Sequence, residues 1–399
     1  MTQHEVVILS GARTPIGRFL GGLASLTAAQ LGQIAVREAV ARAGIDAEDV
    51  SEVILGNVVS AGVGQALPRQ VSIGAGIPSS VGGLSVNKVC GSGLKAVMIA
   101  ANAIKADDGV IYIAGGTESM SNAPFLLRDH RTGFKYGKTE LIDALQNDGL
   151  WCSLCDWGMG NAAEFVAREL NVTRAELDDY AFTSHMRAHF ATTQGHFADE
   201  IVPVCINGKH EDTIIDRDES IRPSTTVEAL AKLKPAFEQD GVVTAGNAPG
   251  MNDGAAAVVV ASRAYAESKG ITPLARIVAY GQAAVDPAWL FYAPVKAIPI
   301  ALARAGWTMA DVDLVELNEA FAAQVVADVK GLAKDGFKLP YEKLNVNGGA
   351  IALGHPIGAS GTRVLITLIH ALKQRGLKRG IASLCLGGSE AVAMAVELI

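Results

Sequence analysis

Two stretches of the chain, EAVARAGIDAEDVSEVILGN at 38–57 and IALARAGWTMADVDLVELNE at 300–319, read as versions of one another. Their Arg-Ala-Gly, Asp-Val and later Val positions coincide when one stretch is laid over the other. A second pair follows in the same order, because GVIYIAGGTES at 109–119 resembles GIASLCLGGSEA at 380–391. Two copies of such long segments indicate two similar half-domains and not the many short units of a solenoid.

Strands and helices alternate through the first half. An apolar strand at 5–11 precedes an amphipathic helix at 27–43, which Gly44 is expected to end. Further strands are expected at VSEVILGNV, SVNKVC and VIYIAGG, with a helix at 91–106 before the last of them. The second half repeats this order over 274–399. The predicted fold class is α/β, with two similar halves that pack as alternating helix and sheet layers.

A more polar stretch separates the two halves. It carries one strong helix, at 174–194, with Thr173 as N-cap and Glu176 at the capping-box position. We interpret this stretch as an inserted loop domain that covers a site on the sheet ends. The predicted division is an N-terminal half at 1–121 plus 246–270, an insertion at 122–245, and a C-terminal half at 271–399.

The bulk composition excludes several classes of protein. The chain has 399 residues, 49% of them hydrophobic, and a net charge of −7. No run of Lys and Arg indicates a nucleic-acid or membrane surface. The apolar run GAAAVVVA at 254–261 is far shorter than the roughly 20 residues that span a bilayer. The first residues lack the basic-then-apolar form of a signal peptide, so we expect a cytoplasmic enzyme.

The five cysteines are an odd number in a long chain, so a disulfide framework is not expected. Cys152-Ser-Leu-Cys155 has the spacing of half a zinc site or of a redox pair. It lacks a second Cys/His pair at a usual distance, and its neighbours Trp151, Leu154 and Trp157 are typical packing residues. We predict no metal site, and the role of the two cysteines stays open.

Four residues at predicted strand ends are candidates for chemistry. Cys90 precedes Gly-Ser-Gly and a helix, whose N-terminal dipole favours a thiolate and whose free N–H groups suit an oxyanion. His355 lies in a Gly-rich run at the equivalent turn of the other half, so the two could meet across the pseudo-twofold axis. Asn318 and Cys385 each end a strand.

Each candidate also has a structural alternative. The cysteines and the histidine would fit a packed core, and Asn318 would fit the N-terminus of the following helix as a cap. As a set, however, they supply a nucleophile, a base and a second proton-transfer group, which acyl transfer through a thioester requires.

The chain resembles a thiolase over nearly its whole length. The motifs that carry the resemblance are VNKVCGSGLKAV, TAGNAPGMNDGAAA, NEAFAAQ, NVNGGAIALGHPIGASG and the terminal CLGG. The resemblance implies that Cys90 accepts the acyl group, that His355 activates it, and that Cys385 exchanges a proton with the substrate α-carbon. Asn318 would hold a water that, with His355, stabilises the enolate oxygen. The N–H groups of Cys90 and Gly387 would form a second oxyanion hole.

By the same resemblance, coenzyme A is a substrate and no cofactor is tightly bound. Arg222 would lie near the adenine and Met159 in the pantetheine tunnel, with Leu233 and Pro249 as further contacts. The implied reaction is Claisen condensation or thiolytic cleavage, between two acetyl-CoA and acetoacetyl-CoA plus CoA, in lipid metabolism. Such enzymes are usually homodimers or homotetramers, and neither nucleic acid nor membrane is an expected partner.

Other activities remain alternatives. A degradative 3-ketoacyl-CoA thiolase of fatty-acid β-oxidation would act on longer chains by the same chemistry. A decarboxylating ketosynthase would have no use for Cys385, and a cysteine-dependent acyl-CoA hydrolase would leave the enolate machinery around Asn318 idle. A non-catalytic acyl-CoA-binding relative would not need the reactive residues.

Four positions depart from the usual thiolase pattern. Gly158 stands where His is frequent, and Pro249 stands where Ser is usual. The last motif runs CLGGSEA, and Leu-Phe-Tyr at 290–292 replaces a Met-Gly segment. We expect the lost His and the two added aromatic side chains to reshape the acyl pocket.

Overall fold

The computed structural model describes residues 5–208 and 211–399 and is built on one mixed sheet. The strand order is β14-β15-β16-β13-β1-β12-β5-β3-β4, and β2 pairs with β12. The strands are β1 (Val6–Arg13), β2 (Gly17–Arg18), β3 (Glu52–Gly56), β4 (Gly82–Val86), β5 (Ile111–Ser119), β12 (Asn252–Ser262), β13 (Ala275–Ala284), β14 (Leu314–Leu317), β15 (Arg379–Leu386) and β16 (Glu390–Leu398).

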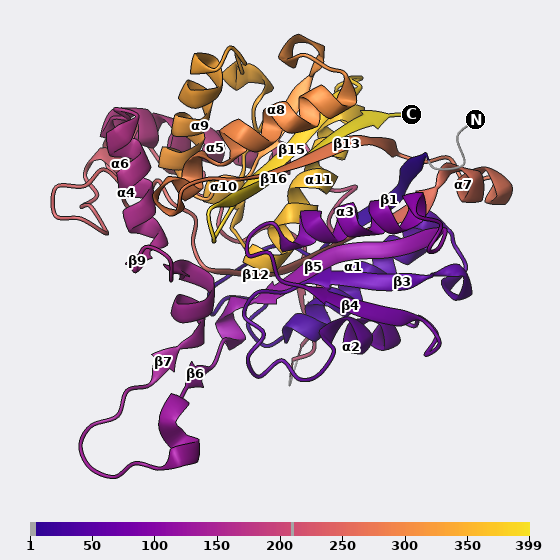
Figure 1. Cartoon of the computed structure of the whole chain (residues 1–399), viewed down its shortest axis with the longest axis horizontal. Helices are drawn as coiled ribbons and strands as arrows, with labels where there is room; N and C mark the ends of the chain where they lie inside the picture. Colours follow the sequence, from indigo (N-terminus) through magenta and orange to yellow (C-terminus); the bar gives the residue numbers. More distant parts are fainter. Residues whose placement is uncertain (1–4, 209–210) are drawn as a thin grey trace.

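The sheet repeats one arrangement twice. In the first half β3 pairs with β5 in parallel, and β5 and β1 both pair with β12 antiparallel. In the second half β14 pairs with β15 in parallel, and β15 and β13 both pair with β16 antiparallel. The halves join where β1 meets β13 over the short register Val7↔Arg276 and Ile8↔Ala275. The predicted duplication is therefore confirmed (Figure 1).

Helices cover both outer faces and fill the space between the halves. α1 (Ala28–Ala43) packs on β1 and β12, and α8 (Pro294–Ala305) packs on β13 and β16. α3 (Ser92–Lys105) and α11 (Ile357–Gln374) pack against each other, and α11 contacts β5 and β12 of one half and β14 and β15 of the other. The layers are thus helix, sheet, helix, sheet, helix, as predicted (Figure 1). The remaining helices of the two halves are α2 (Leu67–Gly74), α7 (Arg263–Lys269), α9 (Ala322–Lys334) and α10 (Ala350–Leu353).

Two helices begin where their capping residues predict. Thr27 accepts a hydrogen bond from the N–H of Gln30 in a capping box, and Gly44 ends α1 in the left-handed region. Thr173 likewise caps α5 (Arg174–Thr193), with Glu176 accepting from the Thr173 N–H at 2.7 Å. Local side-chain hydrogen bonds therefore fix the starts of both predicted helices.

The stretch between the halves folds into small hairpins and helices. The hairpins pair β6 (Phe125–Leu126) with β7 (Ile142–Asp143), β8 (Trp151–Cys152) with β9 (Trp157–Gly158), and β10 (Val204–Ile206) with β11 (Thr213–Ile215). Its helices are α4 (Met159–Glu169), α5 and α6 (Val227–Ala231). The β6–β7 arm projects away from the body at the lower left of Figure 1. The exact division into three parts stays a prediction. In the described part of the chain, no helix has the length and apolar character needed to cross a membrane.

The helices α3 and α11, which pack against each other between the two halves, approach so closely that side chains would not fit at their contact. A Cβ on Gly361 of α11 would lie 2.3 Å from the Leu94 backbone nitrogen of α3. A Cβ on Gly93 of α3 would lie 2.6 Å from Thr362 Oγ1 and 2.9 Å from the Thr362 backbone nitrogen. Glycine at both positions lets the N-terminal parts of the two helices touch, and each helix begins two residues after a candidate reactive residue.

We expect Gly361→Ala to destabilise the protein. Alanine would improve helix propensity by up to about 1 kcal/mol. Overpacking against a backbone atom that cannot move aside costs roughly 1–3 kcal/mol, so the clash should win. Thermal unfolding of the variant should show a lower Tm than the wild type. Gly82→Ala is the matched control, because its Cβ would meet nothing closer than Glu52 Oε1 at 3.6 Å. Equal Tm values for both variants would contradict the close contact.

Candidate active site

A cavity of about 490 Å³ brings together candidate residues from both halves of the chain. Cys90, His355, Cys385 and Gly387 all line it. Residues of the stretch between the halves close its other side, namely Gln146, Gly149, Leu150, Trp151, Gly158, Met159, Gly160, Asn161 and Phe237. Cys90 and His355, which were expected from the sequence to meet, thus both line this one cavity.

Cys90 occupies a tight turn between β4 and α3. The preceding residue, Val89, has φ 44°, a left-handed conformation that is costly for a β-branched residue. Ser92 holds the turn, because its Oγ accepts from the Lys88 N–H at 2.9 Å and donates to the Val89 carbonyl at 2.6 Å. The strained turn presents the sulfur to the cavity at the start of α3.

Burial controls the protonation of Cys90. It raises the pKa of the Cys90 thiol to about 11, and N–H groups of Gly387 and of Cys90 itself lower it in part by donating to the sulfur. These N–H groups favour a thiolate, but desolvation outweighs them, so the Cys90 thiol stays protonated in the free protein. A thiol in this state needs a neighbouring base. The same two N–H groups are those predicted for an oxyanion hole.

His355 lies between α10 and α11, so no strand directly precedes it, contrary to the sequence-based expectation. Leu344 forms an isolated bridge with Val315, so the strand expected before the Gly-rich run does not form. The His355 N–H donates to Asn252 Oδ1 at 2.8 Å, which fixes the backbone of this turn. The glycines around it make this irregular path possible, with Gly348 and Gly354 both at positive φ.

The hydrogen bonds assign the tautomer of His355. Its Nδ1 lies 2.6 Å from Ser360 Oγ, and that hydroxyl donates to the Pro356 carbonyl at 3.0 Å. Because Ser360 has one proton to donate, its oxygen accepts from Nδ1–H, and Nε2 carries the lone pair of the ring. Burial, with a contribution from Arg363, lowers the pKa of His355 to about 3. His355 is thus a neutral imidazole with Nε2 as its basic atom.

Asn318 follows β14 and is fully buried behind the cavity wall. Its Nδ2 lies 3.4 Å from His355 Nε2, and its backbone N–H donates to the Ser383 carbonyl at 2.9 Å. The alternative that Asn318 caps the next helix is wrong, because Phe321 is the N-cap of α9. Asn318 therefore contacts the candidate base, although it does not itself line the cavity.

Cys385 lies one residue before the end of β15 and is buried, yet it faces the cavity. Burial raises the pKa of its thiol well above the ordinary value, and Cys90 and Asp328, when ionised, would add to that rise. The two cysteines are therefore both protonated at neutral pH, and the thiolate of Cys385 would be a strong base.

Glu118 supports the site from behind and was not predicted. Its carboxylate accepts from the N–H groups of Val58 at 3.0 Å, Val59 at 3.1 Å and Gly358 at 2.9 Å. It thereby joins the first half to the first turn of α11, where a negative charge is favoured. Burial raises its pKa to about 7, against these hydrogen bonds. Ser360 and Asn252 were also missed, although both lie in motifs that carried the thiolase resemblance.

Of the predicted coenzyme A contacts, Met159 and Pro249 line the cavity, but Leu233 and Arg222 do not. Leu233 is partly exposed near Gly246. The Arg222 N–H donates to His185 Nδ1 at 3.2 Å. A role for these two residues in binding the outer part of coenzyme A stays a prediction.

An aromatic wall forms one side of the cavity. Phe291, Phe321 and Phe237 line it, with ring centroids 5.4 Å apart for the first two and 6.2 Å apart for Phe321 and Phe237. A Cβ on Gly160 would lie 2.2 Å from the Phe237 ring, so a side chain there would displace that ring. Tyr292 does not line the cavity and instead packs over Gly331. Of the two added aromatic residues, only Phe291 therefore shapes the pocket.

Cys152 ends β8 and Cys155 lies in the turn between β8 and β9, and both lie outside the lining of the cavity. Cys152 is buried and Cys155 is half-buried, and both are free thiols. Within residues 5–208 and 211–399, no group of three or more His, Cys, Asp or Glu side chains is arranged to hold a metal ion.

Comparison with known protein families matches nearly the whole chain to the thiolase family. The family model described as "Thiolase, N-terminal domain" matches residues 6–264, and "Thiolase, C-terminal domain" matches residues 271–398. A protein of Cupriavidus necator named acetyl-CoA acetyltransferase is 50% identical over 394 residues, which is 98% of this chain and 99% of the relative. A protein of the same name from Syntrophomonas wolfei is 49% identical over 398 residues, covering 99% of this chain and 100% of the relative.

Solved structures agree with this placement. The crystal structure of the Bacillus anthracis acetyl-CoA acetyltransferase matches with a TM-score of 0.96 at 42% identity, covering 100% of this chain and 99% of that one. The acetyl-CoA acetyltransferase from Syntrophomonas wolfei matches with a TM-score of 0.97 at 42% identity, covering 100% of both chains. The predicted fold is confirmed by both.

We expect the alkylation of Cys90 by iodoacetamide to report its raised pKa. Because only the thiolate reacts, the rate should rise roughly tenfold per pH unit between about pH 7 and 9, with no plateau in that range. Mass spectrometry of the Cys90 peptide follows the reaction. Alkylation of the exposed Cys205, measured in the same digest, is the control that shows that the reagent is active. A rate that is already constant near neutral pH would mean that a thiolate forms in the free protein.

Proposed function

Because the chain belongs to the thiolase family, we propose that it joins two acetyl-CoA into acetoacetyl-CoA and free CoA, and catalyses the reverse cleavage. The protein is an acyltransferase, and its relatives of about 50% identity carry the name acetyl-CoA acetyltransferase. The observation that carries the proposal is the convergence of two thiols, a neutral imidazole and two N–H groups aimed at the Cys90 sulfur on one cavity.

The first step is transfer of an acetyl group to Cys90. We assign the base to His355, whose Nε2 takes the thiol proton as the sulfur attacks the thioester carbonyl. The N–H groups of Cys90 and Gly387 then stabilise the oxyanion, in keeping with their aim at the sulfur. When the C–S bond of the substrate breaks, the imidazolium returns its proton to the leaving CoA sulfur. The products are acetyl-Cys90 and free CoA.

The second step forms the carbon–carbon bond. The protonated Cys385 first passes its thiol proton to the neutral His355 Nε2, which lies on the same cavity. The Cys385 thiolate then removes a proton from the α-carbon of a second acetyl-CoA, and its raised pKa makes it a strong enough base. Asn318 Nδ2 and the protonated His355 Nε2 stabilise the enolate oxygen, directly or through a water, as their 3.4 Å contact allows. The enolate carbon attacks the acetyl group, and Cys90 leaves as the thiolate and takes the proton back from His355. Cleavage runs through the same steps in reverse, with Cys385 as the proton donor.

The comparisons favour this reaction over the alternatives. The named relatives are acetyl-CoA acetyltransferases, and neither a long-chain thiolase nor a hydrolase is supported by them. The aromatic wall of Phe237, Phe291 and Phe321 limits the space beside the reactive cysteines, which supports a short acyl group. The position of Cys385 in the cavity supports carbon–carbon chemistry over a ketosynthase or a non-catalytic role.

We also propose the substrate contacts, the cellular location and the oligomeric state of the enzyme. Coenzyme A thioesters enter as substrates, with Met159 and Pro249 along the tunnel and Leu233 and Arg222 at its outer end, and no cofactor is tightly bound. The enzyme acts in the cytoplasm as a homodimer or homotetramer. The β6–β7 arm supports contacts between copies, because it exposes large apolar side chains, namely Phe125, Leu127, Phe134, Tyr136 and Leu141.

Cleavage of acetoacetyl-CoA and of a longer 3-ketoacyl-CoA, each with and without free CoA, tests the function. We expect cleavage only when CoA is present, because CoA is the acceptor of the acyl group on Cys90. We expect the shorter substrate to react faster, because of the aromatic wall. Faster cleavage of the longer chain would indicate a degradative thiolase. Free acid released without CoA would indicate a hydrolase, and the roles of Asn318 and Cys385 would be withdrawn.

Replacing Cys385 should separate the two steps. In Cys385→Ala, acylation of Cys90 should persist, because His355 and the two N–H groups remain. Condensation should fall by at least about 10³-fold, because no base reaches the α-carbon. Isotope exchange between acetyl-CoA and free CoA measures the first step, and acetoacetyl-CoA formation measures both. An equal loss of the two activities would contradict this division of roles.

A further inference from the structure

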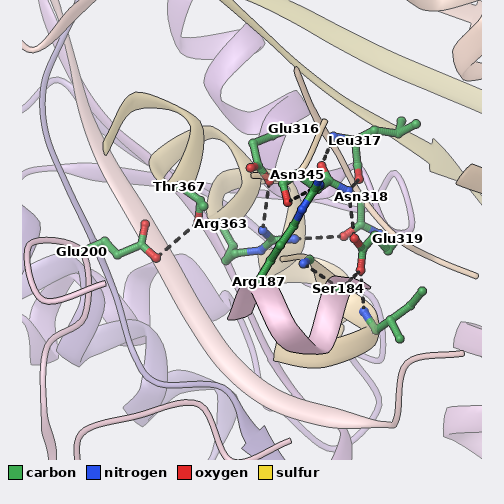
Figure 2. A network of polar contacts seen from close by, with 12 residues as sticks. Ser184, Arg187, Glu200, Glu316, Leu317, Asn318, Glu319, Asn345, Arg363 and Thr367 are labelled. Atoms are coloured by element: carbon green, nitrogen blue, oxygen red, sulfur yellow. Dashed lines mark hydrogen bonds and ion pairs between the residues drawn. The ribbon is translucent and has the colours of Figure 1, made fainter. Parts of the chain in front are cut away.

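We infer that Arg363 is a positioning residue for the enolate site: it holds the Asn318 amide so that the amide nitrogen faces His355. This inference rests on the proposed function, because it assigns Arg363 no role unless Asn318 and His355 stabilise the enolate. Nothing in the sequence pattern singled out Arg363, which lies within the helix that follows the His355 turn. The tertiary structure brings its side chain to the end of β14 (Figure 2).

The geometry around Asn318 leaves its amide one productive orientation. Arg363 Nη2 donates to Asn318 Oδ1 at 3.3 Å, and Asn318 Nδ2 lies 3.4 Å from His355 Nε2. A guanidinium only donates hydrogen bonds, so the oxygen of the amide must face it. The Nδ2 group is thereby turned toward His355 with its N–H donors. Without Arg363 an amide flip would present an acceptor to the enolate oxygen, which would repel it.

The arginine is not a saturated structural ion pair. Arg363 is 2% exposed, and its Nη1 lies 3.7 Å from Glu316 Oε2, also buried. In the part of the chain that the structure describes, Arg363 Nε and Nη1 and both Glu316 carboxyl oxygens have no hydrogen-bond partner. Burying an incompletely paired guanidinium is costly. No complete ion pair offsets this cost, and the side chain donates a hydrogen bond to Asn318. The contact with Asn318 therefore indicates a role for Arg363 in the site.

One face of α11 supports both members of the enolate site. Ser360 and Arg363 are three residues apart and share that face. Ser360 binds His355 Nδ1, and Arg363 binds Asn318 Oδ1. Glu316 and Asn318 are two residues apart at the end of β14, so their side chains point to the same side and both reach Arg363. The helix thus sets the mutual orientation of the imidazole and the amide.

The test compares the two partial reactions in Arg363→Met. Because Arg363 acts through Asn318, the kcat of condensation should fall about 10²-fold, the scale of a misplaced catalytic group. Isotope exchange between acetyl-CoA and CoA, which needs Cys90 and His355 but not the enolate site, should stay near the wild-type rate. The KM for acetyl-CoA should change little. Arg363→Lys should recover part of the condensation, because one ammonium N–H can still reach Oδ1.

A double variant shows whether the effect passes through Asn318. Asn318→Ala alone should reduce condensation, and adding Arg363→Met to it should cause no further loss. Thr367→Val is the matched control, because Thr367 lies one turn further along α11 and donates to Glu200 at 3.3 Å, away from the site. It should leave both partial reactions unchanged. If Arg363→Met does not fold, Arg363→Lys carries the same comparisons with a smaller expected loss.

Three results would overturn the inference while the proposed function stood. They are equal loss of exchange and condensation in the folded Arg363 variant, a loss in the double variant equal to the product of the single losses, and the same pattern in Thr367→Val. A wild-type enzyme that forms no acetoacetyl-CoA would instead overturn the proposed function, and the inference with it.

Discussion

The close contact between α3 and α11 is the constraint on which the site depends. The two helices belong to different halves of the chain, and glycine at 93 and 361 lets their N-terminal parts touch. Cys90 precedes one helix and His355 precedes the other, so the contact places a thiol and an imidazole on the same cavity. Glu118 reinforces this arrangement, because its carboxylate accepts hydrogen bonds from N–H groups of both halves. The layered fold thus brings two helix N-termini together at the site.

Burial then decides the chemistry of the groups that meet there. It raises the pKa of Cys90 to about 11 and lowers that of His355 to about 3, so the free site holds neutral groups. Neutral groups cost less to bury than separated charges. Charge therefore develops only during the reaction, and fixed N–H donors are placed where it appears. Orientation matters more than preformed charge in such a site, which is why hydrogen bonds to Ser360 and Arg363 bear on function.

The end of β14 joins the site to the stretch between the halves. Glu319 accepts from Tyr180 at 2.8 Å and from the Ile351 N–H at 3.0 Å. It also accepts from Ser184 at 2.7 Å (Figure 2), and Tyr180 and Ser184 both lie on α5. Asn345 donates to Glu319 at 3.0 Å and accepts from the Leu317 N–H at 2.9 Å. The two residues that directly follow β14 thus face different partners, Asn318 the candidate base and Glu319 the covering helix α5.

The sequence by itself determined the duplicated α/β fold, the capped helices α1 and α5, and the candidates Cys90, His355, Asn318 and Cys385. These follow from local patterns, since periodicity, caps and glycine-rich turns act over a few residues. The irregular turn before His355, the protonation of Cys90, and the parts of Glu118, Ser360 and Arg363 were decided only by the tertiary structure. Desolvation and hydrogen-bond partners depend on residues far apart in the chain, and no local pattern records which of them will meet.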